Sequence, residues 1–376
     1  MRALHLDEDW RFLCQFFPSN LDELAKSTGA VKRWRNVRDG EELLRLCLAY
    51  VVGDFSLRTT AGWATRSYWL QIKDTSVLHR LRNAAPFLER VLAHLLNHRV
   101  GAEGARASVV RLVDATCLSI PGSVGSDWRI HAVYEPLRGR LVSVEVTDFT
   151  GGERLGIHRF ESGDVVVGDR GLAHARGIHE VHEREAFVLL RMHWQNIKLL
   201  SPEGQSLDIQ GILQRADQGI TGTDVSVPLK GKTAVPARLL VRPLPRDLAE
   251  QARAQKRRTA SKKGRKPSTL GIQLAGYFTL LTTIPEEFAP DPAVMEYYRI
   301  RWQIELFFKR CKSLLNLDSL RAVDPDLVRT YCVAKLIQIA LAELLASEGE
   351  SFSPWGFPSE RWPADEFLAS DAHASS

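Results

Sequence analysis

The amino-acid sequence predicts an α/β fold that is preceded by a helical N-terminal region. Residues up to about 100 carry apolar side chains at helical spacing. Residues 108–182 alternate β-branched and polar positions in short runs separated by turns, which is typical of strands. Residues 297–317 contain helix formers and neither proline nor glycine, which predicts a helix. At 376 residues the chain can bury a large core and form two or three structural units.

Composition narrows the class of protein. A hydrophobic content of 44% and a charged content of 25% are ordinary for a soluble globular protein. The five cysteines are scattered without a CxxC pair, which argues against a disulfide framework or a zinc site and fits a reducing cytoplasm. No apolar run approaches ~18 residues and the N-terminus has no apolar signal core, so neither a membrane span nor secretion is expected.

The charge is unevenly distributed along the chain. The net charge is +5, but residues 343–376 contain seven acidic residues and one basic residue. A basic body with an acidic end suits a nucleic-acid-binding protein, although many enzymes are equally basic. Residues 348–376 are rich in Ser, Pro, Gly and acidic residues, so we expect this tail to be poorly ordered.

Residues 1–104 are predicted to form a helical region that binds DNA. Ser56 is a suitable N-cap, and residues 74–76 could cap a second short helix. That second helix would carry His79, Arg80 and Arg82, so the pair resembles a helix-turn-helix unit. A helical bundle with a basic surface explains the same pattern equally well, and both interpretations remain open.

Residues 105–184 are predicted to form the order β-β-β-α-β-α. The first strand contains Asp114, and a hairpin of two strands follows it. The fourth strand ends at Asp169, and Gly171 follows in the turn. Polar groups at the ends of strands in an α/β sheet are favoured positions for chemistry.

Residues 185–288 contain four further strand patterns and one strongly basic segment. Residues 251–266 hold eight basic residues and no acidic ones, so we expect a mobile loop or a helix that becomes ordered on a polyanion. A solvated surface loop is the alternative. The cations predicted to bind DNA here are Lys256, Arg257, Arg258, Lys262 and Lys263.

Residues 289–347 are predicted to be helical, and one helix in them carries a narrow polar stripe. At ~100° per residue the stripe contains Tyr298, Arg301, Glu305, Lys309 and Lys312. A solvated face with i,i+4 ion pairs is the plain interpretation of such a stripe. The predicted buried face consists of Ile300, Ile304, Phe307, Phe308, Cys311, Leu314 and Leu315.

Three acidic residues suggest a metal site. Asp114, Asp169 and Glu305 would repel one another around a cleft unless cations held them, and a hard cation such as Mg²⁺ or Mn²⁺ suits carboxylate oxygens. Two such ions ~3.5–4 Å apart would activate a nucleophile and stabilise the leaving oxygen of a phosphodiester. Taken alone, each aspartate could instead sit at a strand end or in a tight turn.

Three motifs resemble those of bacterial insertion-sequence transposases of the IS-four type. The spacing Tyr298-x2-Arg301-x3-Glu305-x6-Lys312 resembles the Y-x2-R-x3-E-x6-K signature of that family. The sequence around Asp114 resembles its first-aspartate region, together with Pro121-Gly122, Asp127-Trp128-Arg129 and His131. The sequence Gly168-Asp169-Arg170-Gly171 resembles its second-aspartate region. The resemblance covers roughly residues 40–345.

The resemblance implies a ribonuclease-H-like catalytic domain that is interrupted between Asp169 and Glu305 by a mostly β insertion. It implies a transposase that binds the terminal inverted repeats of its element, cleaves double-stranded DNA through a hairpin intermediate and joins the element to target DNA. Asp114, Asp169 and Glu305 would hold the two metal ions. Synapsis of two ends implies at least a homodimer on DNA, and the protein would be associated with the bacterial nucleoid.

The same resemblance assigns residues that bind DNA. Tyr298, Arg301 and Lys312 would contact phosphates near the cut, and we group Lys309 and Arg170 with them. An aromatic side chain would hold a flipped base. The first candidate is Trp194, for which a core position is equally plausible, and Tyr277 or Phe278 are the others.

Two rival functions remain from the sequence. A metal-dependent nuclease of the same fold would keep the three acids but would not need the signature on residues 298–312. An inactive, domesticated DNA-binding relic predicts the loss of at least one acid, and none is lost here.

Overall fold

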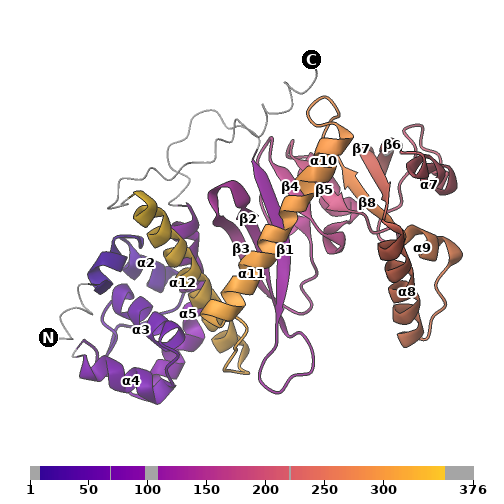
Figure 1. Ribbon diagram of the computed structural model, residues 1–376. Coiled ribbons are helices and arrows are strands. Elements are labelled where there is room, and N and C mark those ends of the chain that lie inside the picture. The colour runs from indigo at the N-terminus through magenta and orange to yellow at the C-terminus, as the bar shows by residue number, and fades with distance from the viewer. Residues whose placement is uncertain (1–8, 68, 98–108, 220–221, 352–376) are drawn as a thin grey trace. The chain divides into compact units, whose positions relative to one another are not determined.

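The computed structural model describes residues 9–67, 69–97, 109–219 and 222–351 (Figure 1). The chain divides into two compact units, one formed by Met1–His98 and Arg329–Ser376 and the other by Arg99–Val328. Most of the predicted disordered tail lies outside the described residues. In the part of the chain that the structure describes, no helix is both long enough and apolar enough to cross a membrane.

The first unit is helical. Asp39 and Ser56 accept hydrogen bonds from backbone N–H groups in the first turns of α3 and α4, so the predicted cap at Ser56 is confirmed. Arg329 Nε donates to the Glu89 carboxylate at 2.6 Å, which fastens the last helix to α5. Its helices are α2 (Leu21–Ser27), α3 (Gly40–Val52), α4 (Leu57–Arg66), α5 (Asp74–Asn97) and most of α12 (Pro325–Ser351).

The predicted second short helix of this unit is wrong in length. Residues 74–76 begin α5, a single helix of 24 residues that continues through Pro86. Pro86 is exposed, so water can satisfy the backbone carbonyl that loses its partner there. Buried residues recur at helical spacing on both sides of it, including Leu81 and Leu88, and this continuous apolar face outweighs the proline.

The second unit is built on one mixed sheet with the strand order β3-β2-β1-β4-β5-β8-β7-β6 (Figure 1). β1, β2 and β3 form an antiparallel meander, β1, β4 and β5 run parallel, and β8, β7 and β6 are antiparallel. The strands are β1 (Val110–Leu118), β2 (Trp128–Glu135), β3 (Arg140–Asp148), β4 (Val165–Gly168), β5 (Phe187–Arg191), β6 (Gly222–Leu229), β7 (Lys232–Pro243) and β8 (Tyr277–Thr282). The strands predicted within residues 185–288 therefore extend the sheet that carries β1 and β4.

Helices cover both faces of this sheet. On one face Val166, Val188 and Leu239 pack with Ile178 of α6 and Leu213 of α7 in a single apolar core. On the other face Phe307 of α11 stacks on Tyr134 of β2, with 5.0 Å between the ring centroids. The remaining elements are η2 (Pro136–Arg138), η3 (Leu155–Ile157), η4 (Arg170–Leu172), α6 (Ala175–His182), α7 (Ile209–Asp217), α8 (Arg246–Lys262), α9 (Thr269–Leu274), α10 (Asp291–Tyr297), η5 (Tyr298–Arg301) and α11 (Trp302–Leu315).

The predicted helix over residues 297–317 is interrupted. α10 ends at Tyr297, the 3₁₀ turn η5 follows, and α11 ends before Asn316, which is left-handed with φ 51°. A 3₁₀ turn has three residues per turn, so a wheel at 100° per residue misplaces the side chains around it. Tyr298, predicted on the polar stripe, is buried.

The predicted buried face of this helix is mostly correct. Ile304, Phe307, Phe308 and Cys311 are buried, and Ile300 and Leu315 are partly buried. Leu314, at the edge of the predicted face, is 75% exposed and is the exception.

The basic segment forms the exposed helix α8, which extends away from the sheet in Figure 1. Ala249 is its one buried residue, and the loop interpretation is wrong for residues 251–262.

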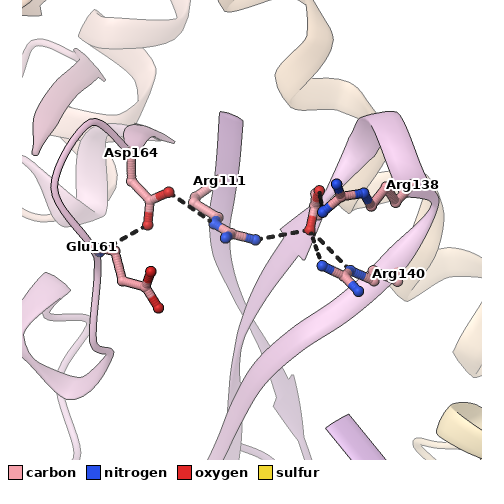
Figure 2. Close-up of polar contacts among 6 residues, drawn as sticks. Arg111, Arg138, Arg140, Glu161 and Asp164 are labelled. Carbon is pink, nitrogen blue, oxygen red and sulfur yellow. Dashed lines mark hydrogen bonds and ion pairs between the residues drawn. The ribbon is translucent and has the colours of Figure 1, made fainter. Parts of the chain in front are cut away.

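A buried network of charged residues joins the starting ends of the central strands (Figure 2). Arg111 of β1 donates to Glu135 at 2.9 Å and lies 3.3 Å from Asp164, the residue before β4. Arg140 of β3 and Arg138 bind the same glutamate at 2.9 and 3.0 Å. The network fixes one end of β1 and β4, and the predicted catalytic aspartates lie further along the same strands.

Candidate active site

Two of the predicted acids lie on neighbouring parallel strands. Val113 of β1 is paired with Gly168 of β4, so Asp114 and Asp169 each follow a paired residue. The Asp114 carboxylate accepts a hydrogen bond from the N–H of Ala115, and Asp169 accepts one from Gly171, both at 2.8 Å. Both aspartates lie where the sequence predicted them, one within a strand and the other directly after one.

The charge at these aspartates has no paired cation. The pKa of Asp114 is raised to about 6, mainly by burial and also by the carboxylates of Asp169 and Glu153, although the Ala115 N–H and the Arg301 guanidinium oppose the shift. Among the described residues, no lysine, arginine or histidine forms an ion pair with Asp114 or Asp169. A cation placed between them would therefore stabilise the ionised forms.

Glu305 lies near Asp114 but its carboxylate is paired. Arg301 Nη1 contacts Glu305 Oε1 at 2.6 Å, and the Glu305 side chain is 55% exposed. Glu305 and Asp114 line the same open hollow of about 540 Å³. The other polar residues that line it are Thr116, Lys309, Lys312, Ser313 and Asp318.

The donor set suits a hard divalent cation, although the side chains are not gathered around one point. Within the described ranges, no group of three or more His, Cys, Asp or Glu side chains stands close enough to hold a metal ion. The aspartate carboxylates are hydrogen-bonded to backbone N–H groups and Glu305 is paired with Arg301. Carboxylate oxygens are the ligands that Mg²⁺ and Mn²⁺ prefer, and the buried negative charge at Asp114 fits them.

Cationic and aromatic side chains lie beside the aspartates. The Arg301 guanidinium lies 5.7 Å from the Tyr298 ring centroid, and burial raises the pKa of Tyr298 to about 12. Tyr298 packs edge-on against Phe278 at 5.6 Å, and Arg191 of β5 lies over that same ring at 5.3 Å. Burial, and then the nearby Arg191, lower the pKa of Arg170.

Several buried guanidinium nitrogens here have no hydrogen-bond partner in the described part of the chain. They are the Nε atoms of Arg129, Arg191 and Arg301. Buried donors without partners are unfavourable, and phosphate oxygens are strong acceptors that would satisfy them. Arg191 was missed from the sequence. The signal that could have identified it is its position at the end of the strand that follows Asp169.

The remaining predicted residues fall into two groups. Lys309 is exposed, and Arg170 directly follows Asp169 and is exposed as a residue, although its guanidinium is partly desolvated. Lys312 Nζ donates to the Cys117 carbonyl at 3.2 Å. The α8 cations are exposed, and Lys256 is close enough to His193 to lower the pKa of that imidazole, after the larger effects of burial and Arg170.

All three candidate base-stacking residues make contacts within the fold, and those of Phe278 are with Tyr298 and Arg191. Trp194 is partly buried and packs against the sheet core. Tyr277 is buried, and its hydroxyl donates to Asp217 at 2.9 Å.

Carboxylates on adjacent strands beside arginines are typical of metal-dependent enzymes that act on phosphodiesters. A family model described as a transposase DDE domain matches residues 106–341, which include Asp114, Asp169 and Glu305. The transposase for insertion sequence element IS421 of Escherichia coli is 35% identical over 92% of this chain and 95% of its own. The chain belongs to the DDE transposase family.

More distant proteins are also similar. The transposase for insertion sequence element IS231B of Bacillus thuringiensis subsp. berliner is 23% identical over 87% of this chain and 77% of its own. Among solved structures, the piggyBac transposase synaptic complex with hairpin DNA matches with a TM-score of 0.40 and 12% identity, over 90% of this chain and 75% of that chain.

Proposed function

We propose that this DDE transposase binds the terminal inverted repeats of an insertion sequence, cleaves double-stranded DNA there and joins the element to target DNA. The observation that carries the proposal is the pair Asp114 and Asp169, adjacent on parallel strands and without cation partners among the described residues. Arginines with unpaired donors lie beside this pair. Negative carboxylates for a cation and positive groups for a phosphate are the two requirements of phosphodiester cleavage.

We assign Asp114, Asp169 and Glu305 as the ligands of the divalent ions that this family uses, with Mg²⁺ as the expected ion, Mn²⁺ as a substitute and two ions per site. When bound, such ions activate the attacking oxygen and stabilise the leaving oxygen of the phosphodiester. Glu305 must release Arg301 to take this role, and the freed guanidinium would then be available to a phosphate.

The cationic side chains would hold the DNA backbone. Arg301, Arg191, Arg170 and Tyr298 would contact phosphates next to the cleaved bond, because they lie together beside Asp169. Lys309 and Lys312 line the hollow with Asp114 and would contact the strand on that side. The α8 cations would contact DNA further away.

The order of the strands supports a ribonuclease-H-like catalytic domain. The antiparallel meander β1–β2–β3, with β4 and then β5 parallel to β1, surrounds the two aspartates. We propose the same domain limits as above: a DNA-binding region over 1–104, a core over 105–184 and 289–347, and an insertion over 185–288 whose first strand, β5, pairs with β4 of the core. The part of the second core segment from Arg329 onward groups with the N-terminal helices in the structure. We further propose a hairpin intermediate, a homodimer on DNA, and a base-stacking role for Trp194 or Phe278.

The test is incubation of the purified chain with labelled DNA copies of the sequences that flank its gene, in the presence of Mg²⁺. Nicked ends, hairpins and products joined to a target plasmid are expected in that order. Nicks without hairpins or joined products would indicate the metal-dependent nuclease, and DNA binding without any nick would indicate the inactive relic.

A further inference from the structure

A fourth acidic residue lies next to Asp169. Glu153 is in the connection between β3 and β4, between Asp148 and η3. A Cβ atom added to Gly171 would lie 1.9 Å from Glu153 Oε2 and 3.2 Å from Asp169 Oδ1. The two carboxylates therefore lie beside the same point, next to a backbone position that only glycine leaves open.

The Glu153 carboxylate has no hydrogen-bond or ion-pair partner among the described residues. It is half-buried. Arg129 is near enough to favour its ionised form, but Arg129 Nη1 donates to the Gly151 carbonyl at 3.0 Å. A partly buried charge without a partner is unfavourable, and a second carboxylate beside it adds repulsion.

Three other glutamates illustrate the contrast with Glu153. Glu180, Glu183 and Glu296 each pair with a lysine or an arginine. Glu153 lies beside Asp169 without an ion pair among the described residues, and its charge also raises the pKa of Asp114. Its position fits a group whose partner is a bound cation.

We propose that Glu153 is a fourth carboxylate of the active site and binds a divalent cation together with Asp169. This inference rests on the proposed function, because it adds a ligand to the site assigned above. Glu153 would contribute a further hard oxygen donor beside Asp169, whereas Glu305 of α11 lines the hollow that contains Asp114. Gly171 would keep the space that the two carboxylates share.

The direct test measures Mn²⁺ binding by the full chain in the absence of DNA, from the electron paramagnetic resonance signal of free Mn²⁺. Glu153→Gln should raise the Kd for Mn²⁺ about 10–100-fold, the range found when groups that support metal ligands are removed. Glu287→Gln, an exposed glutamate in the turn after β8, is the control for the lost charge and should bind Mn²⁺ like the unaltered chain. Asp169→Asn is the positive control.

A second test uses the contact with Gly171. Gly171→Ala should displace the Glu153 carboxylate and weaken Mn²⁺ binding in the unaltered chain. In a Glu153→Ala background the same change has no carboxylate to displace, so its effect should be much smaller. Equal effects of Gly171→Ala in both backgrounds would contradict the inference, and melting temperatures of all variants identify any that are misfolded.

The outcomes separate the two proposals. If Asp169→Asn loses Mn²⁺ and Glu153→Gln binds it like the control, the proposed function stands and Glu153 is not a ligand. If Asp114→Asn and Asp169→Asn also bind Mn²⁺ like the control, the acid assignment in the proposed function fails together with this inference.

Discussion

Charged residues lie toward both ends of strands β1 and β4. Those at the start form ion pairs with one another, whereas those further along do not. At the start, Glu135 is 2% exposed and three guanidiniums bind it, while Asp164 binds Arg111 (Figure 2). Further along, Asp114 and Asp169 accept only backbone hydrogen bonds among the described residues. The difference separates charges that pair with one another at the start of the strands from the charges of Asp114 and Asp169, which we propose bind a metal ion.

The comparison also explains how Asp114 and Asp169 can hold fixed positions although no ion pair among the described residues balances their charge. Breaking a buried, fully paired network is strongly destabilising, so the start of β1 and β4 is held in register. Backbone pairing continues in the same register up to Val113 and Gly168, which places Asp114 and Asp169 side by side. The ion pairs of Glu135 and Asp164 at the start of the strands therefore help to fix the positions of Asp114 and Asp169.

The largest effect is expected on DNA cleavage, when Asp114 or Asp169 is replaced. Asp114→Asn or Asp169→Asn should reduce Mg²⁺-dependent cleavage by at least about a thousandfold, because metal ions contribute several kcal/mol and each 1.36 kcal/mol is a factor of ten. Quantified nicking of labelled element ends measures this. Glu287→Gln is the control, and cleavage within a factor of a few of normal would remove the altered aspartate from the site.

The same Asp114→Asn change should stabilise the metal-free fold, which is the opposite of its effect on cleavage. Since burial raises the pKa of Asp114 from 3.8 to about 6, its ionised form opposes folding. The gain should be complete above pH 6 and should vanish as the pH falls below 3.8, where both side chains are neutral. Urea unfolding at several pH values, with EDTA present, measures this; a variant that is less stable at pH 7 would contradict it.

Neutralising Glu135, at the start of these strands, should have the opposite effect on stability. Glu135→Gln removes the carboxylate that the buried Arg111 and Arg140 share, although Arg111 keeps its pair with Asp164, and we expect about 3–5 kcal/mol lower free energy of unfolding. Arg176→Ala removes an exposed pair with Glu180 and should change it by less than about 1 kcal/mol. Equal losses in the two variants would show that burial does not distinguish them.

Arg301 connects the two kinds of charge, because it pairs with Glu305 and lies beside the aspartates. A charged hydrogen bond contributes about 1.5–3 kcal/mol, so Arg301→Ala should reduce hairpin formation and joining roughly 10–100-fold more than nicking. Arg299→Ala removes the neighbouring arginine, whose partner is the exposed Glu296, and should have little effect. If nicking, hairpins and joining fall equally, Arg301 is a general binding or folding residue.

The smallest effect is expected on the salt dependence of DNA binding, when exposed cations at the end of α8 are replaced. Lys262→Ala combined with Lys263→Ala should lower the slope of log affinity against log salt by about 1.8, roughly 0.9 for each phosphate contact. Arg246→Ala, at the start of the same helix and paired with Glu250, is the control. An unchanged slope in the double variant would mean that this end of α8 faces solvent in the complex.

Much of the sheet could be predicted from the sequence because its strands are short apolar runs between turns. The hairpin over residues 128–148 and the strands that carry Asp114 and Asp169 lie where alternation placed them. The single sheet could not be predicted, because periodicity reports what one strand buries and not which strand lies beside it. The interrupted helix was missed for a related reason, since a wheel assumes a constant turn per residue.

The candidate site residues were proposed from motifs, and the residues that were missed belong to no motif. Asp114, Asp169 and Glu305 stood out because each belongs to a recognisable pattern. Arg191 and Glu153 belong to no pattern of their own, and only tertiary pairing brings them to Asp169. Tyr298 was placed on a surface stripe, and its burial against Phe278 depends on a strand 20 residues upstream.

The turn η5 joins α10 to α11, and the number of residues in it fixes the orientation of α11. Insertions or deletions there should therefore be tolerated less well than substitutions. One residue inserted before Trp302 would turn α11 by about 100° relative to α10. Glu305 would then leave the hollow that it shares with Asp114, and Phe307 would leave Tyr134. Replacing an exposed side chain such as Leu314 alters neither relation. Descendants of this chain should therefore vary more readily in the residues of α11 than in the number of residues that precede it.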